Sequence, residues 1–169
     1  MTTQADRNIK RLFTRGQTSV TSGMPRVEDL SSILTPSAFC GRWIQSPGGS
    51  LKASWASSSV SFLFSGTKLS FYTGPGTERK DKSNGGTPMI AIMIGPTKEA
   101  TLKSPVYWRT VDPDANAEVL ILDETIHPKP QERTFVQIML IDWASTFELG
   151  AMIYDDVSGY LVPVSNINS

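Results

Sequence analysis

The part of the chain after residue 40 consists of short segments in which apolar and polar residues alternate, and this pattern constrains the fold most. The clearest case is the segment 59–65, in which Val60, Phe62 and Phe64 take every second position. Such alternation buries one face of a β-strand and leaves the other in water. Gly, Pro, Asn and Ser clusters separate the segments, and no convincing amphipathic helix appears among them. The pattern predicts an all-β protein, an antiparallel β-sandwich or jelly roll.

Several further segments share this alternation, and Trp55 takes an apolar position in one of them, which predicts that it lies in the core. No repeat of fixed period is visible, which argues against a propeller. The segments expected to be strands are 41–45, 50–55, 59–65, 69–71, 89–94, 98–102, 107–111, 117–122, 133–141, 146–154 and 160–164.

The N-terminal segment differs in composition, because residues 1–38 are rich in Thr, Ser, Gln and Arg. Its one helical pattern, at 26–34, ends at Thr35-Pro36. We therefore expect two parts. Residues 1–38 form an N-terminal tail that is partly disordered or carries at most one short helix, and residues 39–169 form the β-sandwich binding domain.

Charge and cysteine content exclude several classes of protein. The chain has 16 basic and 16 acidic side chains, so it offers no electrostatic reason to bind nucleic acid or an anionic membrane. Its apolar runs are far shorter than the roughly 20 residues of a membrane helix, and its N-terminus lacks the apolar stretch of a secretory signal. Cys40 is the only cysteine, so neither an internal disulfide nor a thiolate zinc site is available. We expect a cytoplasmic protein without nucleic-acid or membrane partners.

Residues suited to catalysis or metal binding are scarce. An activated nucleophile needs a base within reach, and the only histidine, His127, lies in the proline-rich segment 125–130. Asp112, Asp114 and Asp123 partly match the spacing of a calcium loop, but Ala117 occupies the position of its glycine. An Asx-type turn explains these residues more simply. We expect no catalytic residues, no metal and no cofactor.

A long polar loop, 73–88, joins two apolar segments and is the strongest candidate for ligand binding. Glu78, Arg79, Asp81 and Asn84 supply the donors and acceptors that sugar hydroxyls require. An ion-pair network among Glu78, Arg79 and Asp81 that only holds the loop in place is the alternative.

Sugar binding also requires an aromatic surface, because the apolar face of a sugar ring stacks on Trp or Tyr. Tyr107 and Trp108, between Pro105 and Arg109, are candidates for this contact, although packing residues would have the same pattern. Together with the polar loop they predict a lectin-like protein whose partner is a glycan or polysaccharide.

A resemblance to a known family supports this prediction. The domain resembles the β-sandwich that precedes the catalytic domain of fungal SGNH (GDSL-type) hydrolases, and more distantly the jelly-roll domain of acetyl-xylan-type carbohydrate esterases. The blocks that carry the resemblance occur in this order: Gly41-Arg42-Trp43, Ala53-Ser54-Trp55, 62–67, 76–81 and 84–86, followed by 135–142 and 147–164.

In that family a Gly-Asp-Ser nucleophile follows a segment like 161–164, and no such motif follows here. The resemblance therefore implies a jelly-roll module that binds carbohydrate by analogy and lacks the esterase activity, similar to the intracellular lectins of fungi. An accessory or scaffolding domain of an SGNH-type carbohydrate esterase, which mediates protein–protein contacts, is the alternative function. A homo-oligomer formed through edge strands is also left open.

Overall fold

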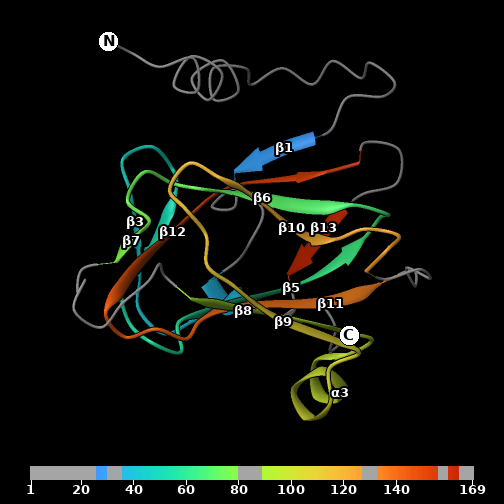
Figure 1. The fold of residues 1–169 in the computed structure, drawn as a ribbon. Helices are drawn as coiled ribbons and strands as arrows, with labels where there is room; N and C mark the ends of the chain where they lie inside the picture. The colour runs from blue at the N-terminus through green and yellow to red at the C-terminus, as the bar shows by residue number, and fades with distance from the viewer. Residues whose placement is uncertain (1–25, 30–35, 80–88, 127–132, 156–159, 164–169) are drawn as a thin grey trace.

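The computed structural model describes residues 26–29, 36–79, 89–126, 133–155 and 160–163, which form two facing β-sheets (Figure 1). The seven-stranded sheet has the order β10-β6-β12-β4-β3, and β1 and β7 also pair with β12. The six-stranded sheet has the order β13-β5-β11-β8-β9, and β2 also pairs with β5. Every pairing is antiparallel. The predicted all-β antiparallel sandwich is confirmed.

The strands have the following bounds: β1 Arg26–Asp29, β2 Phe39–Cys40, β3 Trp43–Gln45, β4 Leu51–Ala53, β5 Ser59–Ser65, β6 Leu69–Thr73, β7 Glu78–Arg79, β8 Ile90–Gly95, β9 Tyr107–Val111, β10 Glu118–Leu122, β11 Thr134–Leu140, β12 Ser145–Tyr154 and β13 Tyr160–Pro163. Within the described ranges, one short helix, α3 (Lys98–Lys103), and one 3-10 turn, η1 (Pro36–Ala38), accompany them. No helix among these described residues is both long and apolar enough to cross a membrane.

The core lies between the sheets and is built from the apolar positions of the alternating segments. Phe62 and Phe64 of β5 are buried together with Phe71 of β6 and Phe147 of β12. The rings of Phe71 and Phe147 meet edge to face, with centroids 5.9 Å apart. This core fixes which side chains of each strand face inward, and therefore which face outward.

Strand β12 organises the seven-stranded sheet because it pairs along both of its edges. One edge pairs with β6 and β7, and the other pairs first with β4 and then with β1. The register toward β6 shifts between Leu149 and Met152, so Gly150 and Ala151 together lie opposite Tyr72. The outer face of the sheet is irregular at this point.

Two predicted elements differ from the structure. The segment 98–102, predicted as a strand, is helix α3. Thr97 caps it by accepting a hydrogen bond from the Ala100 N–H at 3.2 Å, with Glu99 in the first turn and Lys103 in the last. The prediction of a helix at 26–34 is wrong for its first four residues, because Arg26–Asp29 forms strand β1 and pairs with β12. The rest of that segment lies outside the described residues.

The prediction that Trp55 lies in the core is also wrong, because this side chain is 63% exposed. Strand β4 ends at Ala53, and the chain turns at Ser57, whose φ of 70° is in the left-handed region. The apolar-polar alternation in the sequence extends to Trp55, two residues beyond the end of strand β4.

Candidate functional site

Glu148 is the centre of a polar site on the outer face of the seven-stranded sheet. Its neighbours Phe147 and Leu149 are fully buried in the core, so strand alternation turns Glu148 away from the core. Nevertheless only 3% of Glu148 is exposed. A carboxylate in such a place requires partners, because burial of an unpaired charge is costly.

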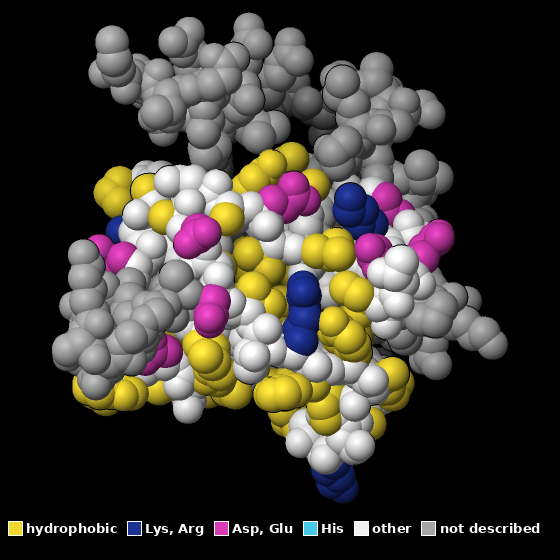
Figure 2. Space-filling view, viewed as in Figure 1, with side chains coloured by type: hydrophobic (Ala, Val, Ile, Leu, Met, Phe, Trp, Pro, Cys, Tyr) yellow, Lys and Arg dark blue, Asp and Glu magenta, His cyan; other side chains and the backbone are white. Residues whose placement is uncertain are grey.

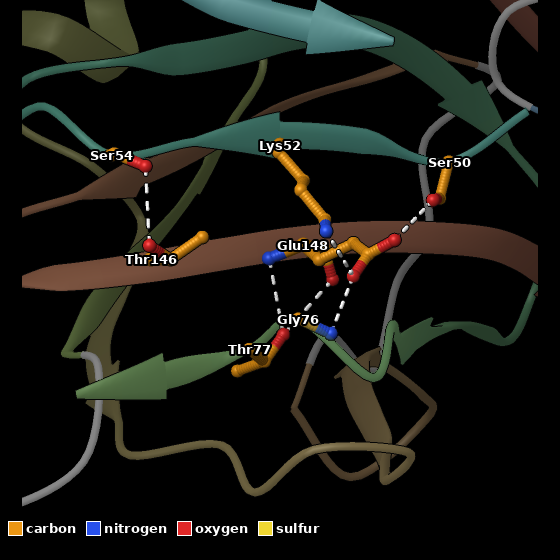
Figure 3. A network of polar contacts seen from close by, with 7 residues as sticks. All are labelled: Ser50, Lys52, Ser54, Gly76, Thr77, Thr146 and Glu148. Atoms are coloured by element: carbon orange, nitrogen blue, oxygen red, sulfur yellow. Dashed lines mark hydrogen bonds and ion pairs between the residues drawn. The ribbon is translucent and has the colours of Figure 1, made fainter. Parts of the chain in front are cut away.

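Three groups satisfy the Glu148 carboxylate (Figure 3). The Ser50 hydroxyl donates to Oε1, and the Gly76 N–H donates to Oε2 at 2.5 Å. Lys52 lies directly opposite Glu148 in the β4–β12 pairing, with Nζ 3.6 Å from Oε2. The carboxylate thus joins β4, β12 and the turn that follows β6.

The turn 74–77 covers Glu148 and is fixed to its backbone. The Gly74 N–H donates to the Glu148 carbonyl at 2.7 Å. The Thr77 hydroxyl donates to the same carbonyl at 3.2 Å and accepts from the Glu148 N–H at 3.0 Å. A Cβ at Gly74 would collide with the Glu148 side chain, so the close approach requires glycine. The first part of the predicted ligand loop is therefore held against β12.

A pocket of about 470 Å³ opens beside Glu148, where the β12 irregularity lies next to Tyr72. This volume is in the range of small-ligand sites. Hydroxyl, amide, ammonium and carboxylate groups share its wall with apolar surface. The lining residues are Val27, Ser46, Gly48, Ser50, Lys52, Tyr72, Thr73, Gly74, Pro75, Asn116, Glu148, Gly150 and Ala151.

Tyr72 provides the aromatic side chain of the pocket. It lies opposite Glu118 in the β6–β10 pairing. Partial burial raises the pKa of its phenol, and the negative charge of Glu118 raises it further. The phenol is therefore protonated at neutral pH and can donate one hydrogen bond and accept others.

The residues predicted as the ligand site lie on two different sheets. Glu78 is exposed on β7 and pairs with Thr146 of β12, so it lies on the same outer face as Glu148, beyond the covering turn. Arg79 pairs with Ser145 through its backbone. Asp81 and Asn84 lie outside the described residues.

The predicted aromatic pair lies on the edge strand β9 of the six-stranded sheet. Strand alternation separates the two rings: Tyr107 packs against the core, whereas Trp108 is 57% exposed on the other face. The structure therefore does not bring Tyr107 and Trp108 together with Glu78.

Sequence reasoning did not select Ser50, Tyr72 or Glu148 as site residues. Glu148 does carry a local signal, because it is the one acidic residue within the apolar strand β12. Its partners are far away in the sequence, since Ser50 is 98 positions distant and Gly76 is 72. The alternation of a strand cannot indicate such partners.

Asp123, which partly matches the ligand spacing of a calcium loop, forms a hydrogen-bonded turn. Its Oδ1 accepts hydrogen bonds from the Thr125 N–H at 2.9 Å, the Thr125 hydroxyl at 2.6 Å and the Ile126 N–H at 3.0 Å. This is an Asx-type turn, as expected from the sequence. Among the described residues, no group of three or more His, Cys, Asp or Glu side chains is arranged to hold a metal ion. His127 lies outside the described residues.

Comparisons with known proteins show a likeness in fold. The structure is similar to that of a family two carbohydrate esterase from Cellvibrio japonicus, with a TM-score of 0.53 and 14% identity over 86% of this chain and 35% of that one. It is also similar to an active site mutant of a family two carbohydrate esterase from Clostridium thermocellum, with a TM-score of 0.50 and 15% identity over 82% of this chain and 33% of that one.

A family two carbohydrate esterase from Clostridium thermocellum in complex with cellohexaose gives a TM-score of 0.49 and 16% identity, over 73% of this chain and 32% of that one. This chain thus spans about a third of the length of the esterases that it matches. A scan of protein-family models and a search of curated proteins found no match.

Proposed function

We propose that this β-sandwich binds a carbohydrate, without catalysis, in the pocket beside Glu148. The observation that carries the proposal is the composition of that pocket, in which a buried carboxylate, an ammonium group and several hydroxyls surround a cavity of about 470 Å³ that also holds Tyr72. Sugars present hydroxyls that both donate and accept, together with apolar C–H faces. A pocket wall that combines hydrogen-bonding groups with apolar surface can contact both parts of a sugar.

The polar groups of the pocket keep capacity for a ligand. A carboxylate has about four lone-pair sites, and Glu148 uses its two oxygens for Ser50, Gly76 and Lys52. The Lys52 ammonium has three donors and is 39% exposed. Lys52 can therefore donate to a sugar hydroxyl while it keeps its contact with Glu148, and the enclosed carboxylate of Glu148 holds the lysine in place.

The distribution of charge also suits a neutral ligand. On the face shown in Figure 2, Lys and Arg side chains are interspersed with Asp and Glu among the described residues, without an extended patch of one sign. Such a surface does not favour a polyanion.

The fold likeness to two carbohydrate esterases supports a carbohydrate-related role. This chain aligns with about a third of the length of each of those enzymes. The absence of a catalytic role is part of the proposal, because the sequence contains neither a Gly-x-Ser-x-Gly nor a Gly-Asp-Ser nucleophile motif. We also propose that the protein is lectin-like, by analogy with the intracellular lectins of fungi.

A glycan array tests the proposal. The folded protein, labelled and monitored by circular dichroism, is expected to bind at least one neutral glycan. No binding across a broad array by folded protein would contradict the carbohydrate function.

A second function, an accessory domain that packs on an esterase, is favoured by a different observation. Leu102, Val106 and Trp108 of the α3–β9 region are 52%, 64% and 57% exposed. Apolar surface of this kind suits a protein partner or self-association. Co-elution with a purified SGNH-type esterase domain that is lost in Trp108→Glu would support it, and retention of separate peaks would count against it.

A further inference from the structure

Two more exposed tryptophans, Trp55 and Trp143, lie at one end of the sandwich. They are 63% and 71% exposed. Trp55 belongs to the connection between β4 and β5, and Trp143 to the connection between β11 and β12. Both connections lead from one sheet to the other at the same end of the strands.

Hydrogen bonds hold these two connections side by side. The Ser57 N–H donates to the Leu140 carbonyl at 2.7 Å, and the Leu140 N–H donates to the Ser58 carbonyl at 2.9 Å. Asp142 accepts hydrogen bonds from the Ala144 N–H at 3.0 Å and from the Ser145 hydroxyl. The tryptophans are thus presented on fixed backbone, which lowers the entropy lost on binding.

A row of polar side chains connects the pocket with this end. On the outer face, the Ser54 and Thr146 hydroxyls are 3.2 Å apart, two positions along the strands from Lys52 and Glu148 (Figure 3). Glu78 lies opposite Thr146 on β7 and continues the row. At about 3.3 Å per residue along an extended strand, the row from Ser50 to Ser54 is about 13 Å long, which is longer than a single sugar ring.

The path carries charges of both signs. Arg42 and Lys52 are basic, whereas Glu78, Asp142 and Glu148 are acidic. The Arg42 guanidinium lies over one face of the Trp55 ring, 5.1 Å from its centroid, and the tryptophan remains 63% exposed. Aromatic faces bind the apolar side of a sugar ring. The members of the row that reach solvent, Lys52, Ser54 and Glu78, offer partners for its hydroxyls.

We infer that the ligand is a neutral oligosaccharide chain of several units, which extends from the pocket along β4 and β12 and stacks on Trp55 and Trp143. This inference rests on the proposed carbohydrate function and adds that the site recognises a chain rather than a single sugar.

The experiment compares chain lengths. Calorimetric titration uses matched disaccharides and hexasaccharides of the cello-, xylo-, manno- and laminari- series. The wild-type protein is expected to bind the hexasaccharide of at least one series about tenfold more tightly than its disaccharide. In Trp55→Ala/Trp143→Ala this ratio is expected to fall to about one, with disaccharide binding unchanged, since each stacking contact contributes about 2- to 10-fold. Trp108→Ala, which removes a tryptophan that is 57% exposed on strand β9 of the six-stranded sheet, is the matched control and keeps the ratio.

The outcomes separate the two claims. Equal affinity for disaccharide and hexasaccharide in the wild type overturns the chain inference and leaves the pocket as a sugar site. Retention of the length dependence in the folded double variant also overturns it. If no oligosaccharide of any length binds, the carbohydrate function itself fails.

Discussion

Lys52 and Glu148 face each other across the β4–β12 pair with Nζ 3.6 Å from Oε2, yet their environments differ: the lysine side chain is 39% exposed and the glutamate 3%. The pair lies outside the core, and the turn 74–77 encloses the carboxylate. This arrangement fixes one wall of the pocket, and the stability of that wall can be tested separately from ligand binding.

Removal of the carboxylate is expected to cost more than removal of its lysine partner. Glu148→Ala leaves the Gly76 N–H and the Ser50 hydroxyl without their acceptor, and we expect a loss of about 2–4 kcal/mol in the free energy of unfolding. Lys52→Met leaves both donors on the carboxylate but removes the counter-charge of a buried group, so we expect a smaller loss of about 1–2 kcal/mol. Urea denaturation measures both. Equal losses would contradict the enclosed position of Glu148.

Gly76 is expected to tolerate no side chain. A Cβ there would lie 2.5 Å from Glu148 Oε2 and 2.6 Å from Lys52 Nζ, so Gly76→Ala must displace the pair, at a cost of about 1–3 kcal/mol. Gly48 is the matched control, because a Cβ at that position meets nothing within 4 Å. Gly48→Ala is expected to change the unfolding free energy by less than about 0.5 kcal/mol. A neutral Gly76→Ala would show that the turn does not press on the ion pair.

The Tyr72 phenol is expected to titrate above its ordinary pKa of 10.0, and Glu118→Gln should lower that pKa without restoring the ordinary value, because burial is the larger cause. The raised pKa disfavours the phenolate in the folded protein. The contribution of Tyr72 to stability is therefore complete below pH about 10 and is lost as the pH rises through the folded pKa. Ultraviolet difference titration, with Tyr72→Phe to assign the signal, measures the shift. A full return to 10.0 in Glu118→Gln would contradict burial as the main cause.

Substitutions at Glu78 and Arg79 test the part of the predicted ligand loop that lies within the described residues. If they bind sugar hydroxyls, Glu78→Ala and Arg79→Ala should leave the melting temperature nearly unchanged and weaken binding by about 1.5–3 kcal/mol, the range for a hydrogen bond to a charged group. Glu99→Ala on α3 serves as the control for loss of a surface charge. Reduced stability with unchanged affinity would instead favour the structural ion-pair network.

The sheets were largely predictable because strand alternation is a local property. The predicted segments 59–65 and 107–111 coincide with β5 and β9, and most other strands differ by one or two residues at their ends. The errors arise where local and tertiary effects compete. Arg26–Asp29 becomes a strand through its pairing with β12, and Thr97 caps a helix where alternation predicted a strand.

The candidate site was much less predictable, because its contacts join segments far apart in the sequence. Glu148 meets Ser50 and Gly76 only after β12 has paired with β4 and the turn after β6 has folded onto it. Tyr107 and Trp108 are adjacent in the sequence and were therefore predicted as one surface. On a strand, adjacent side chains face opposite ways, and the structure separates them accordingly.

A bulky side chain in the pocket beside Glu148 tests whether that pocket is the carbohydrate site. Gly48 lines the pocket, and a Cβ at this position meets nothing within 4 Å. We therefore expect Gly48→Trp to occupy space at the pocket with little effect on stability, and Gly48→Ala is its control. We predict that titration with the neutral glycan selected on the array shows at least a tenfold weaker affinity for Gly48→Trp than for Gly48→Ala, at equal melting temperatures. Equal affinity of the two folded variants would contradict a carbohydrate site in this pocket.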